Sequence, residues 1–405
     1  MGMFVHFGIN TFSDREWGLG NEDPGSFNPG RLDARQWVRI AQSAGCKYIV
    51  LTAKHHDGFC LWPSKLTKHS VASSPWKGGQ GDVVRELADA ARGAGIGLGL
   101  YLSPWDRNAP VYGSGAGYND FYIGQLTELL TNYGSLTEVW FDGANGEGPN
   151  GKKQTYDWAR IHSTVRRLQP NALIFSDSGP DIRWNGNERG IAGDPNWCTV
   201  DPTIVTQPGM DGPNIIASLQ HGEPPPQGTV WRPGEADVSI RPGWFHHPAE
   251  DTKVKTADQL MEIWFSSVGR GSNLLLNVPP TRDGAIADAD VRAMAAFGTA
   301  QRDYWAGAIE PRIVGPTAAL IDLDLGGQMH VRGLELREDI RKGQRIAKYH
   351  VDARIDGGWS TLLHGTTIGH LKIDRFPPMD TQALRILIDD AVDTPRLLSA
   401  RVAIA

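Results

Sequence analysis

Short, nearly continuous apolar runs recur through the first three quarters of the chain, and each predicts a buried strand. A run that is apolar on both faces, such as YIVLTAK at residues 48–54, is typical of a parallel strand covered by helices on both sides. The eight strands predicted along this part of the chain are residues 3–8, 48–54, 96–103, 138–141, 172–177, 196–200, 235–240 and 273–280.

Segments with helical spacing of apolar residues alternate with these runs. In the first of them, Asp33 predicts the N-cap of a helix that ends before Gly45, with Trp37 and Ile40 on its buried face. Eight alternations of strand and helix predict a (β/α)8 barrel, which we assign to residues 1–308. The Pro- and Gly-rich span 202–233 predicts a long loop over its mouth. The other helices are predicted at 82–94, 118–133, 155–168, 256–268 and 287–304.

Beyond Glu310 the helical periodicity ends and short alternating runs replace it. Gly326-Gly327 and Gly357-Gly358 supply candidate turns between these runs. This pattern predicts a small all-β sandwich at residues 309–405, so the fold class is an α/β barrel followed by a β-sandwich domain. The runs are residues 318–325, 330–336, 346–355, 361–363 and 383–388.

Composition and charge narrow the class of partner. The 405 residues carry a formal net charge of −6, with both signs dispersed along the chain. We therefore expect no nucleic-acid partner, because nucleic-acid binders concentrate Lys and Arg on one face. The 14 tryptophans are a clear excess, and their flat apolar rings suit the faces of sugars as well as protein cores.

The cysteines and the longest apolar runs bear on the cellular compartment. Cys46, Cys60 and Cys198 form no CxxC motif and are predicted to be buried free thiols. No run reaches about 20 apolar residues, so we expect no membrane span. Because residues 3–8 already predict a strand, we expect no leader segment: a cytoplasmic protein, or a periplasmic or secreted one if a longer natural N-terminus was trimmed. The sequence indicates no oligomeric state.

The strand at residues 138–141 leads directly into Asp142 and Gly143. A carboxylate at the carboxyl end of a strand is where a parallel barrel places its catalytic groups. The alternative for Asp142 is a side chain that only caps the following turn. Trp140, just before it, fits either a wall for a sugar ring or the core.

Histidines follow two of the predicted strands. His6 ends the first strand, and His55 and His56 end the second. A zinc protease would need HExxH on a helix, which adjacent histidines at a strand end do not provide, so we predict no metal at these histidines. Several ring N–H groups around a polyhydroxylated ligand are the better interpretation. Near the seventh strand, Trp244 and Phe245 offer an apolar seat for a sugar methyl group.

Seven motifs, in this order, carry a family resemblance. MFVHFG, REWG, AKHHDGFCLWPS, GLYLSPWD, EVWFDG, SIRPGWFHH and LLLNVPP together resemble the α-L-fucosidase family of retaining glycoside hydrolases. The resemblance covers nearly the whole chain, since that family also carries a carboxy-terminal β-sandwich. GFCLWPS, GLGLYLSPWD and SIRPGWF resemble the branch of α-1,3/1,4-fucosidases, whose substrates are fucosylated, branched Lewis-type oligosaccharides.

The resemblance implies specific roles. Asp142 would be the nucleophile, and the loop motif RW-x-G-x-E-x-G would make Glu188 the general acid/base. Glu235 is the rival for that role, or else a contact to the sugar beyond fucose. No metal or organic cofactor is needed. The residues implied to contact fucose or orient Asp142 are His6, Glu16, Trp17, His55, His56, Tyr101 and Trp140.

Three other functions stay open at this point. One is an α-L-fucosidase of broad linkage specificity, and another is a barrel that binds fucosylated glycans without cleaving them. The third is a retaining glycosidase for another sugar, such as a galactosidase, because this barrel hosts many chemistries.

Overall fold

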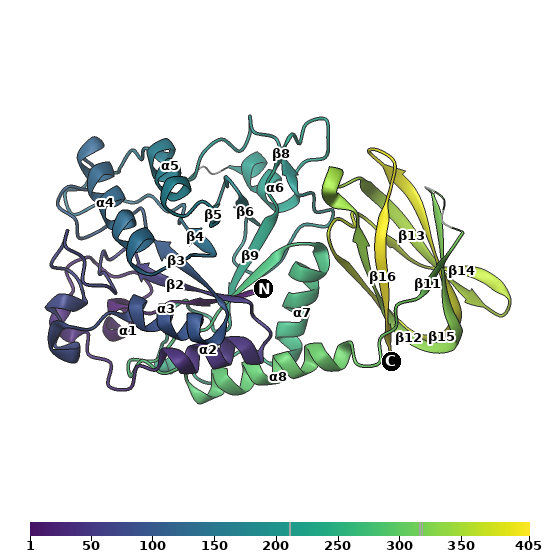
Figure 1. The fold of residues 1–405 in the computed structure, drawn as a ribbon, viewed down its shortest axis with the longest axis horizontal. Helices are drawn as coiled ribbons and strands as arrows, with labels where there is room; N and C mark the ends of the chain where they lie inside the picture. The colour runs from purple at the N-terminus through teal and green to yellow at the C-terminus, as the bar shows by residue number, and fades with distance from the viewer. Residues whose placement is uncertain (210–211, 316, 318) are drawn as a thin grey trace.

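Eight parallel strands close into a barrel, which the computed structural model places beside a separate β domain (Figure 1). The structure describes residues 1–209, 212–315, 317 and 319–405. Met210 and Asp211 of the predicted 202–233 loop, and Ala318 at the start of the predicted run 318–325, lie outside these residues. Around the barrel the strands follow the order β1 (Gly2–Val5), β10 (Asn273–Asn277), β9 (Gly234–Ser239), β6 (Ile182–Trp184), β5 (Leu173–Ser176), β4 (Glu138–Trp140), β3 (Gly97–Leu102) and β2 (Tyr48–Lys54).

Seven of the eight predicted barrel strands are present, and the sixth was wrong. Residues 196–200 do not join the barrel; β7 (Thr199–Val200) pairs instead with β8 (Val230–Trp231) in a separate two-stranded sheet. The sixth barrel strand is β6, which follows β5 after a short loop with no helix between them. β6 was missed because it carries Arg183, whose fully buried guanidinium donates to the carbonyls of Leu219 and Trp197.

Helices cover the outside of the barrel (Figure 1), and the first of the predicted caps is present. The Asp33 side chain accepts hydrogen bonds from the backbone N–H groups of Arg35 and Gln36 at the start of α2. Within the predicted 202–233 loop the structure has a helix, α6. The helices are α1 (Ile9–Ser13), α2 (Ala34–Ser43), α3 (Val83–Ala94), α4 (Ala116–Asn132), α5 (Trp158–Leu168), α6 (Pro213–His221), α7 (Ala257–Ser267) and α8 (Asp288–Tyr304).

Alternate residues of each strand point into the barrel and stack in layers. In β4, Glu138 and Trp140 are both buried, and Asp142 continues the same face beyond the end of the strand. The middle of the barrel is filled by an apolar cluster that includes Phe4, Tyr101 and Trp140. A side chain at the carboxyl end of the barrel, such as that of Asp142, therefore packs against this cluster, which restricts its movement.

The C-terminal domain is all-β, as predicted, and its strands belong to one hydrogen-bonded sheet with a hydrophobic core of its own. Gly326 and Gly327 were predicted to form a turn, but they lie inside the long strand β12, where its register with β15 shifts. Asp356 and Gly357, both at positive φ, form the two-residue turn between β13 and β14. The strands are β11 (Arg312–Val314), β12 (Leu320–Glu338), β13 (Ile346–Ile355), β14 (Gly358–Gly365), β15 (Lys372–Ala391) and β16 (Leu397–Ile404).

Polar contacts fasten the β domain to the barrel. Arg375 of β15 forms a two-pronged ion pair with Glu262 of α7, at 2.6 and 2.7 Å. The side chain of Gln344 bonds both the N–H of Cys198 and the carbonyl of Asn196. Among the described residues, no helix is sufficiently long and apolar to cross a membrane.

Candidate active site

A cavity of about 450 Å³ opens at the carboxyl ends of the barrel strands. This is the end at which a parallel barrel collects its loops and its reactive groups. Nineteen residues line it: Phe4, His6, Trp17, His55, His56, Tyr101, Trp140, Asp142, Gly143, Ala144, Asn145, Lys153, Phe175, Asp177, Trp184, Glu188, Gly209, Asp237 and Trp244.

Asp142 lies in the wall of this cavity, with both carboxylate oxygens held. The hydroxyl of Tyr101 donates to Oδ2 at 3.1 Å, and the backbone N–H of Ala144 donates to Oδ1 at 2.7 Å. The ring of His56 places Nε2 3.9 Å from Oδ2. One quarter of the side chain is exposed, so the carboxylate is oriented by the protein yet open to a ligand.

Two of the three cavity histidines present a lone pair and not an N–H. Nδ1 of His6 donates to Oδ1 of Asn277 at 2.9 Å, which leaves Nε2 unprotonated. Burial lowers the pKa of His6 to about 3, so the ring is neutral. His56 donates from Nδ1 to the hydroxyl of Ser103 at 2.7 Å, because that hydroxyl itself donates to the carbonyl of Trp105.

His55 has the opposite polarity. The amide nitrogen of Asn10 donates to the carbonyl of Glu16 and lies 3.4 Å from Nδ1 of His55, so Nδ1 is the acceptor and Nε2 carries the proton. Burial lowers the pKa of His55 well below its usual value. The imidazoles thus offer one donor and two acceptors, which corrects the prediction of a wall of N–H donors and suits hydroxyl groups, which both donate and accept.

Stacked aromatic rings form the floor of the cavity. The rings of Tyr101 and Trp140 are stacked at 5.2 Å, and those of Trp140 and Phe175 at 4.2 Å. Trp244 lies 5.0 Å from the His6 ring and lines the cavity as expected. Phe245, its predicted partner, is fully buried behind the histidines and does not line the cavity.

Glu188 reaches the same cavity from the loop after β6. Its carboxylate lies 3.4 Å from the indole N–H of Trp244. Partial removal from water raises the pKa of Glu188, and the negative charges of Asp142 and Glu16 raise it further, although the indole N–H opposes this. A raised pKa is what a carboxyl group needs if it is to hold a proton for donation.

Of the predicted neighbours Glu16 and Trp17, only Trp17 lines the cavity. Glu16 does not line the cavity; its carboxylate accepts from the backbone N–H groups of Trp244, at 2.8 Å, and Phe245, at 3.1 Å. It thereby fixes the turn that presents Trp244. Trp17 stands on the rim, more than half exposed, with its ring edge-on to those of His56 and Trp105.

The structure also brings to the cavity two carboxyl groups that the sequence analysis had not selected as site residues. Asp177 follows β5 and accepts from the N–H of Gly209 at 2.8 Å; burial raises its pKa to about 7. Asp237 accepts from the indole N–H of Trp184 at 2.7 Å, and burial raises its pKa well above the usual value. Asp177 carried the same signal as Asp142, a carboxylate at the end of a predicted strand.

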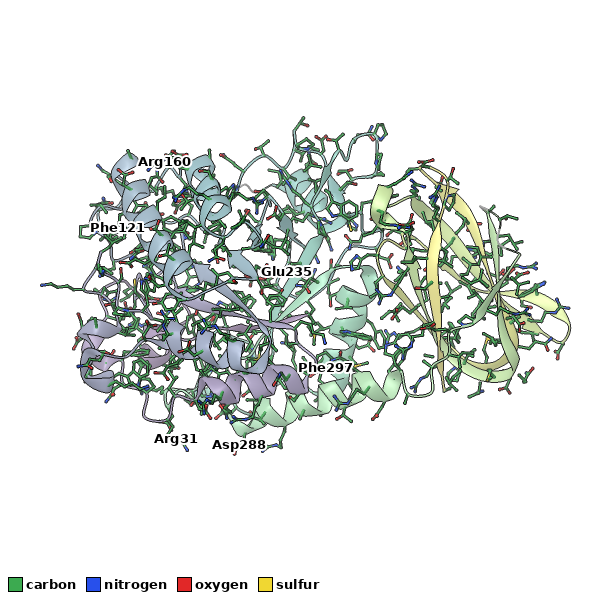
Figure 2. All side chains as sticks on the ribbon, in the orientation of Figure 1. Arg31, Phe121, Arg160, Glu235, Asp288 and Phe297 are labelled. Carbon is green, nitrogen blue, oxygen red and sulfur yellow. The ribbon has the colours of Figure 1, made fainter. Side chains whose placement is uncertain are left out.

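Glu235 does not reach the cavity, which corrects its predicted contact with substrate. It is the second residue of β9, at the amino end of that strand (Figure 2). Its side chain is fully buried. Its carboxylate accepts from the indole N–H of Trp140 at 3.0 Å, the hydroxyl of Tyr48 at 3.0 Å and the amide of Asn273 at 2.7 Å. Asp237, two residues further along the same face, occupies the level at which a substrate contact is possible.

We expect Glu235→Ala to destabilise the fold by several kcal/mol, because each buried donor left without a partner costs about 1–3 kcal/mol. Thermal or urea unfolding measures the loss. Glu188→Ala is the matched control and should leave the melting temperature nearly unchanged, since that side chain is exposed. An unaltered stability for Glu235→Ala would contradict its structural role inside the barrel.

A barrel whose carboxyl-end cavity combines several carboxyl groups with aromatic and imidazole rings is suited to bind and cleave a sugar, and fold and site together define a glycoside hydrolase. Residues 1–301 match the family model described as alpha-L-fucosidase. The chain belongs to the alpha-L-fucosidase family, and its activity is the hydrolysis of α-L-fucosides.

Individual relatives agree with this assignment. The chain is 42% identical to alpha-L-fucosidase 1 of Arabidopsis thaliana, over 98% of this chain and 83% of the relative. A crystal structure of a glycoside hydrolase 29 family member from an unknown rumen bacterium superposes with a TM-score of 0.92 at 40% identity, over 100% of this chain and 75% of the other. A Ruminococcus gnavus GH29 fucosidase, solved in complex with fucose, gives a TM-score of 0.86 at 31% identity, over 100% and 92%.

Proposed function

We propose that this α-L-fucosidase works with retention of configuration, with Asp142 as the nucleophile and Glu188 as the general acid/base. The observation that supports the proposal is that both carboxyl groups line one cavity, one held by two donors and the other with a raised pKa. Retaining enzymes of this kind hold their two carboxyl groups about 5–5.5 Å apart, on opposite sides of the bond to be cut.

The reaction then takes two steps. Asp142 attacks the anomeric carbon while the bond to the leaving sugar breaks, and the proton of Glu188 passes to the leaving oxygen. The product is a fucosyl ester on Asp142. The Glu188 carboxylate next takes a proton from water, whose oxygen attacks the same carbon and releases Asp142. Both carboxyl groups end in the states in which they began.

The polar and apolar sides of the cavity suit a 6-deoxy sugar. The alternating donor and acceptor nitrogens of His6, His55 and His56 match ring hydroxyls. Trp244 presents an apolar face for the methyl group that replaces a hydroxymethyl. We therefore place fucose between the histidines and Trp244, with its anomeric carbon toward Asp142.

We further propose a preference for α-1,3- and α-1,4-linked fucose on branched, Lewis-type glycans. The cavity is also lined by loop residues, three of them with polar side chains: Asn145, Lys153, Asp177 and Gly209. In a branched ligand the galactose lies beside the fucose and can reach such groups. Contacts to this remote sugar can be used to stabilise the transition state, which raises kcat as well as affinity.

We expect kcat/KM on a Lewis trisaccharide to exceed that on 2′-fucosyllactose or an aryl α-L-fucoside by about a hundredfold, since two or three hydrogen bonds worth about 1–3 kcal/mol each are lost. Proton NMR of the same digest should show α-fucose as the first anomer released, which reports retention. Equal or faster cleavage of the aryl or α-1,2 substrate would leave an α-L-fucosidase of broad specificity. Initial release of β-fucose would overturn the assignment of a nucleophile.

A further inference from the structure

The outward face of the C-terminal domain carries a second cluster of histidine and carboxylate side chains. His350 of β13 lies opposite His364 of the edge strand β14, with ring centroids 5.6 Å apart. Asp389 of β15, on the other side of β13, has its two oxygens 2.8 and 3.0 Å from Nδ1 of His350. One possible ligand atom from each of the three residues lies within 4.8 Å of the other two.

The arrangement is fixed by the pairing of three neighbouring strands. β14, β13 and β15 are adjacent in the sheet. Tyr349 and Val351, which flank His350, are fully buried in the core of the domain, so His350 and Asp352 point to the opposite, outer side. His350 and His364 therefore meet because they are in register, and Asp389 reaches His350 from the point where the register of β15 with β13 shifts, next to Tyr349.

Imidazole and carboxylate are the ligands that zinc-type ions prefer among nitrogen and oxygen donors. Bond lengths of about 2.0–2.1 Å and tetrahedral angles place neighbouring ligand atoms about 3.3 Å apart. The separation of Nδ1 of His350 from Asp389 is close to this. His364 is exposed on an edge strand, so its side chain has room to turn toward the other two.

Asp352 supplies an independent observation. Its Oδ1 is buried without a hydrogen-bond partner and lies 4.0 Å from Nε2 of His350. Arg385, which is opposite Asp352 in register, is bound instead to both oxygens of Asp322. When Nδ1 of a histidine binds a metal, its proton is carried on Nε2, and a carboxylate behind the ring commonly accepts it. Asp352 lies on the Nε2 side of the ring, and a small rotation that brings Oδ1 from 4.0 Å to about 3 Å would let it accept this proton.

We propose that His350, His364 and Asp389 bind a divalent transition-metal ion of the zinc type, with water in the remaining position and with Asp352 orienting His350 from behind. None of these residues lines the active-site cavity, and fucoside hydrolysis does not involve them. The bound ion ties the edge strand β14 to β13 and β15. Its effect is on the stability of the C-terminal domain.

The same domain offers a matched control pair. His330 of β12 is opposite Asp380 of β15 in register, with Nδ1 and Oδ1 2.9 Å apart, and both side chains are more than half exposed. In the described part of the chain, no third candidate ligand joins this pair. His330→Ala thus removes a histidine–aspartate pair from the domain without touching the proposed site.

The test is calorimetric titration of Zn²⁺ into the full chain after treatment with a chelator. We expect one ion to bind, and we expect His364→Ala and Asp389→Asn each to weaken binding at least about tenfold; Asp352→Asn should weaken it by about 10–100-fold. Zn²⁺ should raise the melting temperature of the native chain and of His330→Ala, but not of His364→Ala. kcat/KM on a fucoside should be the same with and without the ion.

Three results would overturn the proposal. The first is the absence of binding by the native chain at millimolar Zn²⁺. The second is equal affinity in the native chain, His364→Ala and Asp389→Asn, which would place the ion elsewhere, such as at the histidines of the cavity. The third is equal weakening by His330→Ala, which would indicate a general effect of surface histidines. His364→Ala and Asp389→Asn alter exposed side chains, so we expect both variants to fold. Circular dichroism of each variant checks this and separates a loss of folding from the loss of a ligand.

Discussion

Asp142→Asn is expected to lower kcat on every α-L-fucoside by at least about a thousandfold, with little change in the affinity for free fucose. The amide keeps the shape of the side chain and can still accept from the hydroxyl of Tyr101 or the N–H of Ala144. It cannot attack the anomeric carbon, so the route through a covalent ester is lost. Turnover of an aryl fucoside and calorimetric binding of fucose measure the two quantities separately.

Asp177→Asn is the matched control, since Asp177 also follows a barrel strand and lines the same cavity. Burial raises the pKa of Asp177 to about 7, so near neutral pH its carboxyl is protonated much of the time and the amide is a mild replacement. We expect a modest loss of activity in this variant. Near-normal turnover by Asp142→Asn, or an exchange of the two phenotypes, would contradict the choice of nucleophile.

Glu188→Ala is expected to slow hydrolysis of natural glycosides by about 10²–10⁴-fold and to spare substrates with good leaving groups much more. A sugar alkoxide needs a proton as it leaves, whereas an activated phenolate does not. Azide should restore turnover of the activated substrate in part, because a small anion attacks the fucosyl ester without a general base. The rates with both kinds of substrate, with and without azide, are the measurement.

The pH profile gives a second readout for the same residue. A general acid must be protonated, so kcat/KM falls as pH rises through the pKa of Glu188, which burial raises above the ordinary value of a glutamate. Glu188→Gln should remove this alkaline limb. Glu235 is the comparison residue: azide rescue in Glu235→Ala but not in Glu188→Ala would contradict both the burial of Glu235 and the proposed role of Glu188.

The local pattern of apolar and polar residues was sufficient to predict the strands that are buried on both faces. Barrel strands such as β2 were recognised because they are apolar runs, and α2 was recognised because Asp33 is an N-cap with a clear buried face behind it. β6 escaped because Arg183 interrupts its pattern, and its charge is satisfied by carbonyl groups 14 and 36 residues away. No window of sequence contains that information.

The same limit explains what was predicted of the site. Asp142 was found because the end of a strand is a local feature, and Asp177 could have been found in the same way. Glu235 was wrongly placed in the site because the sequence does not show which residues of β9 lie near the carboxyl end of the barrel. In the structure Glu235 pairs with Asn273 at the amino end, and Asp237 lies one layer closer to the cavity. The alternation along GEADVS indicates which side chains point into the barrel. Their height along the barrel axis is known only from the closed barrel.

Taken alone, the sequence determined the kind of fold, the order of its two domains, the family, and a set of candidate groups at strand ends, because each of these depends on periodicity or on short motifs. The tertiary structure decided which of those groups share a cavity and which ring nitrogen of each histidine faces it. It also decided that Glu235 is internal, and that His350, His364 and Asp389 meet across three strands. Those outcomes depend on partners far apart in the chain, such as Asn277 for His6, and distances between such partners arise only when the chain has folded.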